Sequence, residues 1–296
     1  MPKPKKPELK KPQSQSQSQS HPRPSPPPNW PPLRPLLPAT DLRLTALVPD
    51  QIYLIRNFLP AGLCKTYSSF LSSLPLTTTP GKPKKDEAVR VNDRFQVEDA
   101  RFAEMLWSGT AMKELVTRRL GKDEHEEYEE EGAGADGAHQ REDVAELARR
   151  TWGGEVLGLN PNIRIYRYST GQFFAQHCMW REGFWPVLLR WTDFVLTILT
   201  DDESNFLTFR PASSTKSTPA RTTWTLLIYL TACNGGETVF YPEPTRADRN
   251  PEPISVAPEM GMALLHRHGD HCMLHEGKEV TAGEKWVLRS DLVVAR

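Results

Sequence analysis

Apolar and polar residues alternate in short segments through most of the second half of the chain, and turn residues separate these segments. Alternation with a period of two is typical of strands that bury one face. Strands are therefore expected at residues 163–168, 172–177, 222–230, 238–241, 254–257, 261–266, 272–275 and 285–295. Short strands at this spacing favour a closed or sandwiched antiparallel structure.

Two helical patterns precede this β-rich region. The first follows Pro60, repeats apolar residues at helical spacing and ends at Pro75, and the second spans residues 100–120. Each pattern predicts a helix that buries one face against a sheet. Strands are also expected within residues 42–58 and 88–97, and a short helix within residues 143–152.

The stretch from Gly261 to Arg289 carries the strongest chemical signal. His275 ends one apolar run and Lys285 enters the next, with glycines between them. This spacing predicts two adjacent antiparallel strands joined by a glycine-bearing turn, whose inward side chains share one pocket. A neutral imidazole can bind a metal ion and an ammonium group can anchor a carboxylate.

A second candidate segment lies upstream, where two expected strands at residues 163–177 end in His177. The apolar run at residues 224–230 and the turn residues at 234–238 follow it in sequence. In this order, the elements from residue 160 to the C-terminus resemble the iron(II)- and 2-oxoglutarate-dependent dioxygenases with a prolyl 4-hydroxylase-like catalytic domain. The resemblance implies a mainly-β fold with flanking helices (α+β), in which N-terminal helices support a double-stranded β-helix (jelly-roll) core.

The resemblance also implies the site. Two histidines and one carboxylate hold non-haem iron and leave positions for a 2-oxo acid and dioxygen. His177 and His275 match the two histidines, while Lys285 and Tyr168 match the residues that bind the distal carboxylate of 2-oxoglutarate; Arg289 is an alternative anchor. The cofactors implied are Fe(II), 2-oxoglutarate, dioxygen and ascorbate, with no catalytic residues beyond the metal ligands. The reaction implied is hydroxylation of a substrate, a peptidyl proline by default, with release of succinate and carbon dioxide.

The chain departs from this pattern directly after His177. The resemblance implies His-x-Asp, but the chain reads His177-Cys178-Met179-Trp180, and the matching aspartate is Asp202. Residues 181–200 between them are rich in aromatic and aliphatic side chains but too short and interrupted to span a membrane. An alternative function is therefore a catalytically inactive jelly-roll that acts as a binding module.

We interpret residues 178–201 as the translation of a retained intron, against the alternative of a genuine insertion. Cys178-Met179-Trp180 can be encoded TGT-ATG-TGG, which contains the donor-like GTATGT. The codons TGG-ACT-GAC for residues 191–193 contain a branch-like CTGAC, and ACA-GAC for residues 200–201 supplies an acceptor CAG. Excision joins T to AC, which is a tyrosine codon, and restores His-x-Asp with Asp202 as the aspartate.

Composition adds two segments that are expected to stay outside the folded core. The chain is 38% hydrophobic, which is low for a globular protein. Residues 1–40, rich in Pro, Lys, Gln and Ser, are expected to form a disordered tail, either simply solvated or a basic nuclear-localisation or nucleic-acid arm. The acidic run at residues 121–141 is expected to be a flexible loop within the domain at 41–296.

Charge and cysteine usage bear on partners and location. The formal net charge is zero, so neither nucleic acid nor a membrane is an expected partner, and the expected partner is a protein or small-molecule substrate. The four cysteines lie far apart and form no metal or disulfide motif. The N-terminus lacks the apolar core of a signal peptide, so an intracellular location, cytoplasmic or nuclear, is expected.

Overall fold

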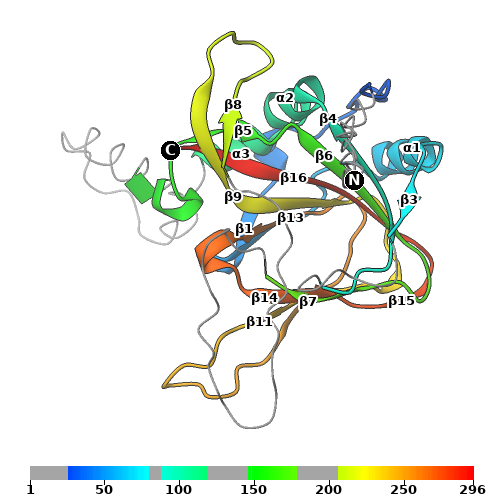
Figure 1. The fold of residues 1–296 in the computed structure, drawn as a ribbon, viewed down its shortest axis with the longest axis vertical. Coiled ribbons are helices and arrows are strands. Elements are labelled where there is room, and N and C mark those ends of the chain that lie inside the picture. Colours follow the sequence, from blue (N-terminus) through cyan, green and yellow to red (C-terminus); the bar gives the residue numbers. More distant parts are fainter. Residues whose placement is uncertain (1–25, 80–87, 119–145, 148, 179–205) are drawn as a thin grey trace, which may run out of the picture.

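The computed structural model describes residues 26–79, 88–118, 146–147, 149–178 and 206–296 (Figure 1). Several expectations concern residues outside these ranges. They are the first 25 residues of the tail, the acidic run at 121–141, the span at 179–201 that follows Cys178, and Asp202.

In the part of the chain that the structure describes, the larger of two main sheets has ten antiparallel strands. Its long central strands are β9 and β16, which pair along most of their length. The order is β1 (Leu44–Val48), β2 (Ile52–Ile55), β13 (Ala263–Arg267), β9 (Thr218–Tyr229), β16 (Lys285–Ala295), β6 (Asn162–Tyr168), β4 (Asp93–Glu98) and β3 (Thr77–Thr78), with β5 (Val156–Leu159) on β16 and β8 (Phe206–Phe209) on β9.

A smaller sheet of four antiparallel strands packs against the inner face of the larger one (Figure 1). Its order is β12 (Ile254–Val256), β11 (Thr238–Tyr241), β14 (Leu274–Gly277) and β7 (Phe174–His177). Buried side chains from both sheets meet in one cluster, with Tyr229 and Leu264 from the larger sheet and Phe240 and Val256 from the smaller. The expected mainly-β, jelly-roll-like fold with flanking helices is confirmed.

Helices among the described residues pack on the larger sheet through a second cluster of buried side chains; they include α1 (Ala61–Ser72), α2 (Ala100–Ser108) and α3 (Met112–Arg118). The expectation of one continuous helix over residues 100–120 is wrong. Asp99 caps α2 by accepting the backbone N–H groups of Arg101 and Phe102, and Thr110 accepts the N–H of Met112 at 3.2 Å at the start of α3. A hydroxyl cap within the helical pattern begins a second helix there, because it satisfies an N–H group that has no partner inside the helix.

Residues 26–40 pack on the helices, which differs from the expectation that the tail extends to residue 40. The Trp30 ring stacks on Phe102 with ring centres 3.9 Å apart, and its indole N–H donates to Asp99 at 2.8 Å. The Tyr67 hydroxyl donates to the Pro31 carbonyl at 2.7 Å, and Leu33 is buried. A few apolar side chains are thus enough to order this proline-rich segment, because prolines lose little entropy on folding.

The strands that carry His275 and Lys285 are not neighbours, so the prediction that they are adjacent is wrong, although both side chains do line one pocket. β14 belongs to the smaller sheet and β16 to the larger. Between them, β15 (Val280–Ala282) pairs with β10 (Asn234–Gly235), and Gly283 turns the chain with a positive φ of 83°. The connection therefore crosses from one sheet to the other. None of the described helices has the length and apolar character needed to cross a membrane.

Candidate active site

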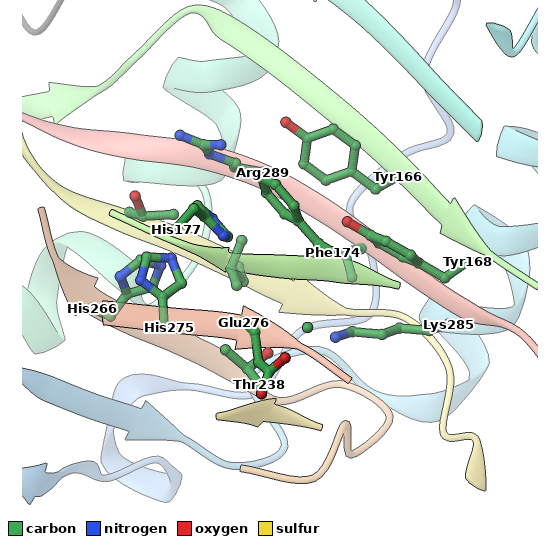
Figure 2. A pocket seen from close by; sticks show the side chains of 14 residues that line it. Tyr166, Tyr168, Phe174, His177, Thr238, His266, His275, Glu276, Lys285 and Arg289 are labelled. Atoms are coloured by element: carbon green, nitrogen blue, oxygen red, sulfur yellow. The ribbon is translucent and has the colours of Figure 1, made fainter. Parts of the chain in front are cut away.

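His177 and His275 lie directly opposite each other on the neighbouring strands β7 and β14. Their ring centres are 4.3 Å apart, and both side chains are buried between the two sheets (Figure 2). Strand pairing therefore brings together the two histidines that the sequence singled out.

Backbone hydrogen bonds fix the orientation of both imidazoles. Nδ1 of His177 lies 2.8 Å from the Ala175 carbonyl oxygen, and Nδ1 of His275 lies 2.8 Å from that of Met273. Because a carbonyl oxygen only accepts, each Nδ1 donates, so the lone pair of each neutral ring is on Nε2. A histidine that binds a metal through one nitrogen is commonly held in this way through the other.

The electrostatic surroundings keep His177 neutral. Burial lowers the pKa of His177 well below its usual value, and His275 and the charges of Arg289 and Arg90 lower it further. Metal binding requires the neutral form of imidazole. His177 is therefore in the protonation state that a metal site needs.

The described residues supply only two of the three ligands that the resemblance implies. Among them, no three ligating side chains surround a point that could hold a metal ion. Cys178 follows His177 directly, and its thiol donates to the Cys272 carbonyl at 3.6 Å. The paired imidazoles fit a metal ion. The expected carboxylate, Asp202, lies outside the described part of the chain.

Lys285 lies in the same pocket with only 5% of its surface exposed. Its Nζ donates to the Gly236 carbonyl at 2.6 Å and lies 5.6 Å from the ring centre of Tyr168, its cross-strand neighbour. Burial lowers the pKa of Lys285 to about 8, although Cys233 and Glu237 act in the opposite direction. A buried ammonium beside aromatic rings is well placed to bind a carboxylate that enters the pocket.

Arg289 lies on the same face of β16 as Lys285 but farther along the strand, on the other side of the pocket from Lys285 in Figure 2. Its Nη2 is 3.5 Å from Oδ1 of Asp291, whose Oδ2 is 3.2 Å from Nη1 of Arg164. Burial alone would raise the pKa of Asp291, but Arg164 and Arg289 lower it to about 2. Arg289 is thus held in a buried ionic group and influences His177, whereas Lys285 suits a carboxylate at the far end of a ligand.

Several pocket residues were not expected from the sequence. Phe174 stacks on His177 with ring centres 3.6 Å apart, and the Arg90 guanidinium lies 4.9 Å from the Phe174 ring centre. Strand parity was the available signal, because alternate residues of β9 and β13 face the interior. The unexpected lining residues are Tyr166, Phe174, Thr225, Leu227, Thr238, His266, Glu276, Gly277 and Val287.

No protein-family model and no curated protein matches the chain. Similar solved structures include a viral collagen prolyl hydroxylase from Paramecium Bursaria Chlorella virus-1 as its 2-oxoglutarate complex, with 13% identity over 83% of this chain and 97% of that chain and a TM-score of 0.38. A Pseudomonas putida prolyl-4-hydroxylase has 11% identity over 83% and 94%, with a TM-score of 0.41.

HygX from Streptomyces hygroscopicus, with nickel and 2-oxoglutarate bound, has 13% identity over 83% of each chain and a TM-score of 0.40.

Proposed function

We propose that the protein is an iron(II)- and 2-oxoglutarate-dependent dioxygenase. The observation that carries the proposal is the pair of oriented imidazoles, His177 and His275, in one pocket with the buried ammonium of Lys285. Two imidazoles suit a first-row transition metal, and a cation at the far end of the pocket suits the second carboxylate of a 2-oxo diacid.

Each residue has a distinct task in this proposal. His177 and His275 bind the metal ion, and Lys285 and Tyr168 hold the distal carboxylate of 2-oxoglutarate, whose orientation they fix. The third ligand implied by the resemblance is the carboxylate of Asp202. When bound, iron with 2-oxoglutarate and dioxygen supplies oxidative decarboxylation to succinate and carbon dioxide together with hydroxylation of a substrate, and ascorbate keeps the iron reduced.

The proposal is tested by iron-dependent formation of succinate from 2-oxoglutarate in the absence of substrate. We expect His275→Ala to abolish this turnover, because it removes a metal ligand. His271→Ala is the matched control, because His271 is exposed and does not line the pocket. Full turnover in His275→Ala would refute the assignment of the metal site.

A second function, an inactive jelly-roll that binds a partner, is favoured by one observation. No carboxylate follows His177 at the position that the resemblance requires. If the purified chain binds neither iron nor 2-oxoglutarate by calorimetry, the binding module is the better description. If succinate forms, a library of proline-containing peptides screened for a mass gain of one oxygen tests the proposed peptidyl-proline substrate.

A further inference from the structure

We propose that His266 is a third metal-binding imidazole, which takes the place of the carboxylate missing after His177 in the full-length chain. The inference rests on the proposed metal site at His177 and His275. His266 lies on β13 in the larger sheet, opposite Thr225 of β9, and lines the same pocket as the other two histidines (Figure 2). The ion would be a divalent first-row transition metal, because such ions accept imidazole nitrogen readily.

The ring of His275 lies at a suitable separation from each of the other two imidazoles for both pairs to bind one ion. Metal–nitrogen bonds of about 2.0–2.1 Å place each ring centre about 3.2 Å from the metal, so two rings at right angles lie about 4.5 Å apart. His177 and His275 have ring centres 4.3 Å apart, and His275 and His266 have ring centres 4.6 Å apart. No three ligating side chains of the described residues surround one point, so His266 must turn about its side-chain bonds toward Nε2 of the other two, already oriented, imidazoles when metal binds.

His266 also has unused hydrogen-bonding capacity, which its neighbour His268 does not have. Among the described residues, Nδ1 of His266 has no hydrogen-bond partner, although the residue is only 3% exposed. An unsatisfied buried nitrogen is costly and calls for a functional explanation. Both ring nitrogens of His268 are engaged, with Thr225 at 3.0 Å and Thr222 at 3.1 Å.

The described carboxylates near the pocket are committed to other partners. Glu276 lines the pocket, but its Oε1 accepts from Tyr241 and lies 2.6 Å from Nζ of Lys278. Asp291 is held between Arg164 and Arg289. His266, by contrast, can add a ligand without breaking an ion pair.

Counting imidazoles on the metal tests the inference directly. X-ray absorption of the Co²⁺-loaded full-length chain is expected to show three imidazoles, falling to two in His266→Gln and staying at three in His268→Gln. Competition with a chromophoric chelator should show Co²⁺ binding weakened at least tenfold by His266→Gln and less than threefold by His268→Gln.

The outcomes separate this inference from the proposed function. Two imidazoles plus a carboxylate in the unaltered chain would overturn the role of His266 and leave the dioxygenase site standing. A chain that binds no Co²⁺ at all would overturn both. If His266→Gln fails to fold, as judged by its thermal midpoint without metal, the imidazole count in the unaltered chain still decides.

Discussion

Lys285 lies directly opposite Tyr168 on the neighbouring strands β16 and β6, with its ammonium nitrogen 5.6 Å from the centre of the tyrosine ring. Both side chains face the interior, where the histidine pair forms another wall of the same pocket. The pocket thus combines a metal-binding end and a cationic end. Binding at the two ends should depend differently on pH and on side-chain identity, so experiments can separate them.

Binding of 2-oxoglutarate is predicted to weaken as pH rises, because Lys285 must be protonated to attract a carboxylate. With a pKa of about 8 in the empty pocket, the ammonium fraction falls about tenfold between pH 7 and pH 9. Calorimetry on the Co²⁺-loaded protein should show a similar loss of affinity. Lys285→Arg should remove this pH dependence, and Lys285→Gln should bind weakly throughout; an affinity of the unaltered protein that is flat from pH 7 to 9 would contradict the role of Lys285.

Asp291 is predicted to contribute to stability through its two arginine neighbours. Asp291→Asn leaves Arg164 and Arg289 as buried cations without this carboxylate, so the free energy of unfolding should fall by about 3–5 kcal/mol. Urea denaturation at pH 7 measures the loss. Asp270→Asn, at an exposed position, should change the free energy by less than about 0.5 kcal/mol, and an equal effect of the two changes would refute the prediction.

The same ion group predicts the acid limit of stability. The pKa of Asp291 is about 2 in the folded protein and about 3.9 in an unfolded chain. A carboxyl with a depressed folded pKa stabilises the fold above its unfolded pKa, and this contribution is lost as pH falls toward 2. In Asp291→Asn, the slope of unfolding free energy between pH 4 and pH 2 should be shallower than in the unaltered protein. Identical slopes would show that Asp291 titrates normally.

Trp30 is predicted to stabilise the domain although it lies in a proline-rich segment. Trp30→Ala removes a ring stacked on Phe102 and a hydrogen bond to Asp99, so the free energy of unfolding should fall by about 1–2 kcal/mol. Deleting residues 1–25 should leave the thermal midpoint unchanged, because their composition predicts no buried surface. A lower thermal midpoint after that deletion would contradict this account. An unchanged thermal midpoint in Trp30→Ala would contradict it as well.

The mature transcript is predicted to lack most of codons 178–201. Excision would place an aspartate two positions after His177, where β7 ends beside His275. Sequencing complementary DNA across codon 177 should find messages in which a tyrosine codon and the codon for Asp202 follow directly. The hypothesis fails if every mature message retains the span and the full-length protein forms succinate.

The sequence by itself determined the repeat of apolar and polar residues along most strands and helices, and the chemical type of the side chains at the candidate site. Alternation placed β6, β11 and β16 within about a residue of their observed bounds, and helical spacing placed α1. His177, His275, Tyr168 and Lys285 were singled out because the sequence around them resembles a known family in its order of elements. β5 and β8 were missed, because their sequences, Val-Leu-Gly-Leu and Phe-Leu-Thr-Phe, do not alternate strictly between apolar and polar residues.

Only the tertiary structure decided which strands pair and which side chains meet. His275 and Lys285 are close in sequence yet lie in different sheets, whereas His177 and His275 are distant in sequence yet lie opposite each other. His266 reaches the pocket because β13 crosses the larger sheet beside β9, and Trp30 is ordered because α2 offers it Phe102. Local periodicity sets which face of a strand is buried, but the partners of that face depend on long-range pairing, which local pattern does not encode.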